Sequence, residues 1–188
     1  MLITGLLLIN NADGQNTYYS RATGGWTTNT TWSLTSGGAA VGGGIYPVSG
    51  DIVNIEGGFN LIIPVSTHAA CATINISSSN AGNGTLTFNN GSSLAVSANI
   101  TVGTAGTTKA GVITMTAGGT ITCGGNLTIG SNAACNITQE ALATVTVNGT
   151  ATVLQPTVNN ITNAWNVNAG TATVTGTFTL DGTNTTNS

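Results

Sequence analysis

The ionisable side chains of this sequence are few, and they are where catalysis would have to begin. The acidic residues lie far apart along the chain: Asp13, Asp51, Glu56, Glu140 and Asp181. Enzymes that cleave polysaccharides use two carboxylates flanking one bond, or carboxylates that hold calcium beside a base. Only Asp51 and Glu56 are neighbours, and an odd spacing places them on opposite faces of an extended strand. We therefore expect no catalytic residues. Asp51 should instead bond the turn backbone beside Gly50, and Glu140 should be a solvated charge at a strand edge.

The other reactive groups form no recognised motif. His68 is the only histidine, has no serine or cysteine partner at a recognised spacing, and is expected in a loop. The cysteines Cys71, Cys123 and Cys135 fit neither a disulfide framework nor a zinc site. Glycines separate strand-like segments, so no phosphate-binding loop between a strand and a helix is expected. The sequence predicts no cofactor, no metal and no enzymatic activity.

Charge is scarce throughout the chain, which narrows the classes of partner. Among 188 residues there are two basic and five acidic ones, and 40% of the residues are hydrophobic. Two cations, Arg21 and Lys109, cannot neutralise a nucleic acid backbone or dock on an anionic membrane, and no segment is long enough to insert into one. Abundant threonine, valine, asparagine and glycine favour strands and turns. The composition indicates an all-β protein.

A repeat organises the second half of the chain. Units begin at Thr85, Val112, Asn136 and Asn163, with spacings of 27, 24 and 27 residues. Each unit holds three short segments in which polar and apolar residues alternate, as in a strand with one buried face. A meander of antiparallel hairpins would explain the Asn-Gly turns between segments, but not their constant offsets. The repeat therefore predicts a parallel β-helix with three strands per coil and coils of 24–27 residues.

Stacked coils bring equivalent residues into columns, with the apolar members inside. The outward positions are largely threonine, which suits an exposed β surface without adding charge. Cys123 falls among valines and is expected to be a small buried hydrophobe. The predicted core columns are Leu94, Ile121, Val145 and Ala172; Val96, Cys123, Val147 and Val174; and Ile100, Leu127, Ala151 and Phe178. Upstream, residues 51–55, 60–63 and 72–76 resemble a first, irregular coil.

Residues 16–50 form a module of different composition ahead of the coils, which we place in residues 51–188. The module contains most of the aromatic residues of the chain, and such a module can cover the end of a solenoid core. Arg21 is expected to stack on Trp26 or Trp32 and so stabilise this cap. The cap residues are Tyr18, Tyr19, Arg21, Trp26, Trp32 and Tyr46.

Residues 1–15 begin with an apolar run that is too short to span a bilayer. The run has two interpretations: the remnant of a secretory signal, or a strand that pairs with a neighbouring subunit. In the second interpretation the pairing residues are Leu2, Ile3, Leu6, Leu7, Leu8 and Ile9.

The Tyr18-Tyr-Ser-Arg, Gly24-Gly-Trp26 and Thr31-Trp-Ser33 elements, with Ser49-Gly-Asp51 after them, resemble the amino-terminal region of secreted surface proteins of Bacteroidota. The resemblance covers about the first half of the chain. It implies that the aromatic elements open a right-handed β-helix, that Ser49-Gly-Asp51 leads its first strand, and that the protein is extracellular or on the cell surface.

Three functions are compatible with these features. The leading hypothesis is a non-enzymatic structural protein, a rod that acts as a filament subunit or adhesin stalk and associates with itself head to tail. The second is a carbohydrate-binding module with Trp26, Trp32 and Tyr46 as stacking platforms. The third is a degenerate glycan lyase or hydrolase, which would depend on Asp51 or Glu56.

Overall fold

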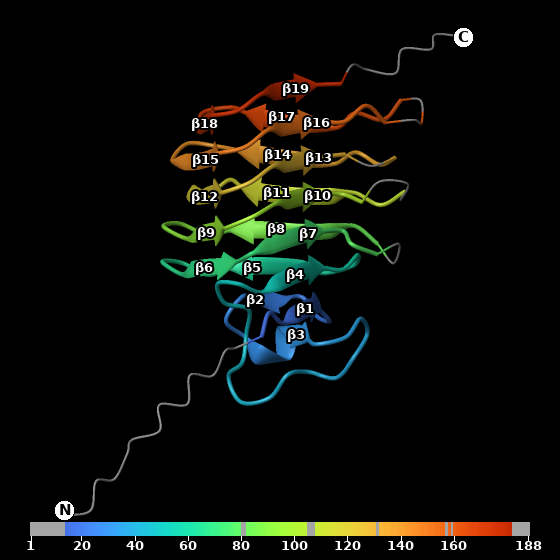
Figure 1. The fold of residues 1–188 in the computed structure, drawn as a ribbon, viewed down its shortest axis with the longest axis vertical. Helices are drawn as coiled ribbons and strands as arrows, with labels where there is room; N and C mark the ends of the chain where they lie inside the picture. Colours follow the sequence, from blue (N-terminus) through green and yellow to red (C-terminus); the bar gives the residue numbers. More distant parts are fainter. Residues whose placement is uncertain are drawn as a thin grey trace, which may run out of the picture.

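The chain folds into a stack of β-coils (Figure 1). The computed structural model describes residues 14–79, 82–104, 108–130, 132–156, 158 and 160–181. Apart from a short 3-10 turn, Asn29–Thr31, its regular elements are all strands. These strands form three sheets that run along the stack, and from residue 52 onward each complete coil adds one strand to each sheet.

Each sheet orders its strands along the stack, from the first coil to the last. The first sheet contains β3 (Trp32–Ser33), β1 (Thr17–Ser20), β4 (Ile52–Ile55), β7 (Thr73–Ile76), β10 (Ile100–Val102), β13 (Leu127–Ile129), β16 (Ala151–Val153) and β19 (Phe178–Leu180). The second contains β2 (Gly24–Gly25), β5 (Asn60–Ile63), β8 (Gly84–Phe88), β11 (Gly111–Met115), β14 (Asn136–Gln139) and β17 (Ala164–Val167). The third contains β6 (His68–Cys71), β9 (Ser93–Val96), β12 (Gly119–Cys123), β15 (Ala143–Val147) and β18 (Thr171–Val174).

The parallel β-helix predicted from the repeat is confirmed. Among the described strands, β1 and β3 form the only antiparallel pair, so the hairpin alternative is wrong. The predicted columns also have the predicted register, since Ile121 pairs with Leu94 on one side and with Val145 on the other. Leu127 likewise lies between Ile100 and Ala151. All these residues are buried, because the alternation along each strand sends every second side chain into the stack.

Asparagines hold the corners between coils. The Asn99 side-chain carbonyl accepts the Asn126 N–H at 2.9 Å, and the Asn126 side-chain carbonyl accepts the Thr150 N–H at 2.8 Å. At the next corner position, a Cβ on Gly149 would lie 2.4 Å from the Asn126 oxygen. The corner therefore needs glycine beside asparagine, which explains the recurrent turn residues.

The predicted register is wrong by one residue in the last coil of the second sheet. Asn136 pairs with Ala164 and not with Asn163. Asn163 instead lies buried in the preceding turn, where its side chain accepts the Cys135 N–H at 3.0 Å and donates to the Leu154 carbonyl at 2.9 Å. These two bonds fix the turn and delay the start of β17 by one residue.

The first coil is more regular than the sequence indicated. β6 supplies a strand that was not predicted, and residues 73–76 then begin the next coil. His68 is the first residue of β6 and does not lie in a loop. Its Nδ1 lies 2.7 Å from the Ser93 hydroxyl of the next coil. Small residues, Ala69 and Ala70, hide the alternation that would have revealed this strand.

The last member of each predicted core column is not buried. Ala172 and Phe178 are exposed and Val174 is only partly buried, whereas the members from earlier coils are buried. These three residues belong to β18 and β19, the last strands of their sheets. Each of the three pairs with the predicted residue of the preceding coil, but no described coil covers them.

Candidate functional site at the two ends of the stack

The aromatic cluster at the first end of the stack is part of the core. Trp26 and Trp32 are 1% and 0% exposed, and their rings meet edge to face at 5.4 Å. The Trp32 indole donates to the Trp26 carbonyl at 2.7 Å, and the Trp26 indole donates to the Pro47 carbonyl at 3.0 Å. Tyr18 packs its ring 6.2 Å from that of Trp32. Neither tryptophan is available as a stacking platform for a sugar.

Arg21 stabilises this cap by hydrogen bonds and not by the expected stacking on an indole. Its Nε donates to the Gly38 carbonyl at 3.0 Å, and its Nη1 donates to the Thr30 carbonyl at 3.4 Å. Of the other predicted cap residues, Tyr19 is partly buried in β1 and Tyr46 is exposed. The guanidinium thus ties two loops of the cap together.

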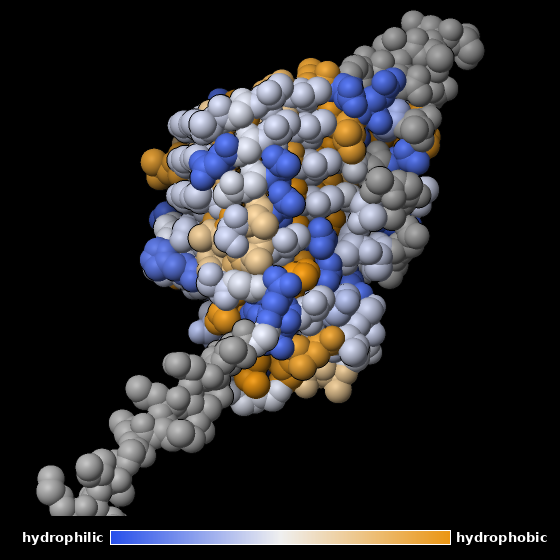
Figure 2. All heavy atoms as spheres, in the orientation of Figure 1, coloured by the Kyte–Doolittle hydropathy of each residue, from blue (hydrophilic) through white to orange (hydrophobic). Residues whose placement is uncertain are grey.

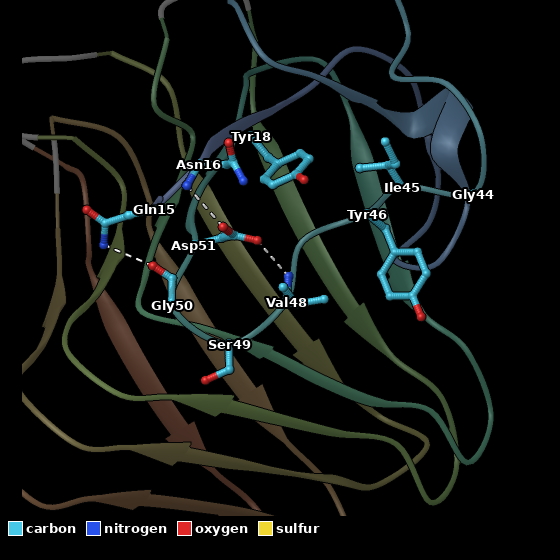
Figure 3. Close-up of a pocket in the computed structure, with 10 residues that line it drawn as sticks. All are labelled: Gln15, Asn16, Tyr18, Gly44, Ile45, Tyr46, Val48, Ser49, Gly50 and Asp51. Atoms are coloured by element: carbon cyan, nitrogen blue, oxygen red, sulfur yellow. Dashed lines mark hydrogen bonds between the residues drawn. The ribbon is translucent and has the colours of Figure 1, made fainter. Parts of the chain in front are cut away.

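A groove of about 540 Å³ opens beside the cap (Figure 3). Tyr18 and Tyr46 line it, and Gln15, Asn16 and Ser49 add polar groups. Its volume falls in the range of small-ligand pockets, which is about 300–1,000 Å³. No sequence motif marked this groove, because its walls come from β1 and from the long loop that precedes β4.

Asp51 forms the floor of the groove and has a structural role there. Its two carboxylate oxygens accept the backbone N–H groups of Asn16, at 3.1 Å, and Val48, at 2.8 Å (Figure 3). The predicted bond to the turn beside Gly50 is therefore present. Burial, reinforced by the nearby Asp51 carboxylate, raises the pKa of Tyr18. A tyrosine phenol is protonated at neutral pH even at its ordinary pKa of about 10, so the Tyr18 hydroxyl can act as a hydrogen-bond donor.

Glu56 lies in a separate groove of about 380 Å³, which Arg21 and Phe59 also line. Its carboxylate accepts the Ser36 hydroxyl, and its backbone N–H donates to Ser20 Oγ at 2.8 Å. Asp51 does not line this groove, and Glu56 does not line the other. Asp51 and Glu56 therefore do not form a pair of carboxylates on the two sides of one glycosidic bond.

Other candidate groups are accounted for by packing. Glu140 accepts the Asn168 side chain at 2.8 Å and is partly exposed, as expected for an edge charge. Cys71, Cys123 and Cys135 are all buried. Burial raises the pKa of the Cys71 thiol to about 12 and that of Cys123 in the same direction. Cys71 and Cys123 are therefore inert hydrophobes at neutral pH.

Within the part of the chain that the structure describes, no group of three or more His, Cys, Asp or Glu side chains could hold a metal ion. The described residues also include no helix that is long and apolar enough to cross a membrane. Asp13 and the proposed pairing strand, with Leu2, Ile3, Leu6, Leu7, Leu8 and Ile9, lie outside the described residues.

The other end of the stack is an apolar surface, which we call the tail face. It surrounds a concavity of about 240 Å³ and consists of Trp165, Val167, Ala172, Val174 and Phe178. Trp165 and Phe178 are in ring contact at 6.0 Å. Below them, the buried Gln139 donates to the Thr171 carbonyl at 2.8 Å and accepts the Trp165 indole N–H. A glutamine at an inward strand position is the sequence signal for these buried hydrogen bonds, and the sequence-based prediction did not use it.

Comparison of the chain with protein-family models, with curated proteins and with solved structures finds no match.

Proposed function

We propose that this protein is a non-enzymatic, extracellular structural protein: a β-solenoid rod that acts as a filament subunit or adhesin stalk and associates with itself end to end. The observation that carries the proposal is the tail face. Phe178 is 51% exposed and Val167 is 42% exposed there, whereas the inward residues of the earlier coils are buried.

The strand edges at the tail face support the same proposal. Among the described strands, β17, β18 and β19 are each paired on one side only, so their outer N–H and C=O groups are open to another strand. Soluble proteins usually protect such edges with charge, proline or a covering loop. The strands β17, β18 and β19 contain no charged residue and no proline. This end is suited to receive a further β-layer.

The opposite end also carries exposed apolar side chains, which we together call the head face: Leu34, Ile45, Tyr46 and Val48. Leu34, Ile45 and Val48 are each at least half exposed, at 53%, 50% and 54%. These residues belong to the long loop between β3 and β4, which lies at the far end of the stack from β19 (Figure 1). Apolar side chains are visible at both ends of the space-filling view (Figure 2). Head-to-tail contact between different faces generates filaments.

Electron microscopy of the purified protein at high concentration tests this proposal. Filaments or short linear oligomers are expected for the wild type and should be lost in Phe178→Asp, which places a charge in the tail face. The matched control is Leu142→Asp, because Leu142 is 83% exposed in a lateral turn between β14 and β15. Dispersed wild-type monomers at high concentration would refute end-to-end association.

A second candidate function is glycan binding in the groove beside the cap. The observation that favours it is the exposed Tyr46 side chain in a groove of ligand size, which Gln15, Asn16 and Ser49 also line. A glycan array with wild type and Tyr46→Ala tests it, since that side chain is 37% exposed and its removal should not unfold the cap. Binding that is absent from the wild type, or unchanged in the variant, would rule out this site.

A further inference from the structure

The third sheet presents a two-dimensional array of threonines on its outer face. Thr144 pairs with Thr120 on one side and with Thr171 on the other. A second column runs beside it, in which Thr146 pairs with Thr122 and Thr173. The two members in each strand are two residues apart and so face the same way. We call these six residues the threonine grid.

The grid has two regular repeats that the fold imposes. Neighbouring strands of a sheet lie about 4.8 Å apart, and residues two apart along a strand lie about 6.7 Å apart. Every grid point carries the same hydroxyl and the same methyl group. The grid does not extend to β9 in the preceding coil, because the residue that pairs with Thr122 there is Ala95.

The grid side chains are accessible to solvent. Thr120, Thr122, Thr171 and Thr173 are exposed, and Thr144 and Thr146 are partly exposed. Within the described part of the chain, none of the six hydroxyls makes a side-chain hydrogen bond to protein. A β-branched side chain has few χ1 rotamers, so little conformational entropy is lost when it binds.

The strands that carry the grid contain no aromatic residue, and Leu142, which is 83% exposed, lies in the turn before β15. The strands β9, β12, β15 and β18 contain no Asp, Glu, Lys or Arg. In Figure 2 the side of the stack on which Figure 1 labels β12, β15 and β18 is mostly pale, with an orange side chain and some blue side chains at its edge. Such a face offers neither the charge that a nucleic acid or membrane surface requires nor the aromatic anchors of a protein interface.

We infer that the threonine grid is an ice-binding surface. Its occupant is solid water, whose oxygen atoms form a lattice with two repeats close to the two repeats of the grid. Hydroxyls at the grid points can hydrogen-bond to lattice water, and the methyl groups between them can order the adjoining water layer. The scarcity of charge matters because strongly hydrated ions hold water in arrangements that do not fit a crystal.

The experiment measures thermal hysteresis and inhibition of ice recrystallisation with the purified chain. The test variant is Thr146→Tyr, in which a bulky ring projects from the middle of the grid; tyrosine favours strands, so the fold should persist. The matched control is Thr114→Tyr, an outward position between Thr87 and Thr138 in the second sheet. Circular dichroism verifies that both variants are folded.

The wild type and Thr114→Tyr are expected to inhibit recrystallisation, and Thr146→Tyr is expected to lose this activity. A wild type with no effect on ice, or equal losses in both variants, would overturn the inference. A third result would also overturn it: the protein binds microcrystalline cellulose or chitin, this binding requires Thr146, and the protein has no effect on ice. The grid would then recognise a crystalline polysaccharide. Thr146 lies on the side of the stack, so micrographs of Thr146→Tyr should still show end-to-end association, and the two proposals can fail separately.

Discussion

Truncating one inward residue tests the stacked core most sharply. Ile121 is 0% exposed and lies in the middle of its column, with Leu94 before it and Val145 after it. Ile121→Ala should leave a cavity that two neighbouring coils cannot fill without losing their hydrogen-bond register. Removal of a buried isoleucine side chain to alanine costs about 2–5 kcal/mol. For a chain of this size that corresponds to a fall in melting temperature of roughly 4–20 °C.

The control is the adjacent residue on the same strand. Thr122 points outward and is exposed, so Thr122→Ala should change the free energy of unfolding by no more than about 0.5 kcal/mol. Urea unfolding of both variants is followed by circular dichroism for the sheets and by tryptophan fluorescence, because Trp32 and Trp165 report opposite ends of the stack. Equal stability of the two variants would refute the inward and outward assignment.

Three further predictions concern single positions. Gly111→Ala should destabilise the fold by about 1–3 kcal/mol, because the new Cβ would lie 2.3 Å from the Gly103 nitrogen. The control is Gly42→Ala, which should be neutral because a Cβ there would have nothing within 4 Å. A Gly111→Ala variant with unchanged thermal stability would disprove the tight corner. Asn163→Ala should lower the free energy of unfolding by about 1–3 kcal/mol, because it removes the two side-chain hydrogen bonds that fix the turn before β17. An unchanged urea midpoint would contradict the observed register. The pKa of the Cys71 thiol is raised to about 12 in the folded protein, whereas the pKa of an unfolded thiol is about 8.5. Below the unfolded value the buried thiol does not reduce the free energy of unfolding. Stability should therefore fall between that pH and about 12, by at most about 1.4 kcal/mol per pH unit. Urea unfolding at about pH 8 and about pH 11, on either side of the unfolded thiol's pKa, should show a smaller fall for Cys71→Ala, and equal falls would argue against the buried thiol.

The repeat could be predicted from sequence because the coils are nearly identical in length and each strand alternates. Register follows from equal spacing, and burial follows from alternation, so Leu94, Ile121 and Val145 could be placed without a structure. The predicted register is wrong where the hydrogen bonds of one side chain, and not the alternation, determine where a strand begins. At Asn163, two buried hydrogen bonds shift the strand by one residue, and spacing alone cannot reveal them.

The grooves and the faces of the ends could not be predicted in the same way. The groove beside the cap joins Asn16 to Tyr46 through a loop with no periodicity. The aromatic residues of the predicted cap differ in exposure: Trp32 is buried and Tyr46 lines the groove. Which aromatic residue faces solvent depends on how the loop folds back over the first coil, and this information lies in contacts between distant residues.

Cross-linking between the two ends tests the proposed rod most directly. The native thiols are buried, so cysteines introduced at Leu34 in the head face and Phe178 in the tail face would be the accessible ones. Treated with a short bismaleimide, the double variant should give a ladder of covalent oligomers on a denaturing gel, and each single variant should give none beyond a dimer. A double variant that stays monomeric at concentrations where both cysteines are fully modified would contradict head-to-tail association.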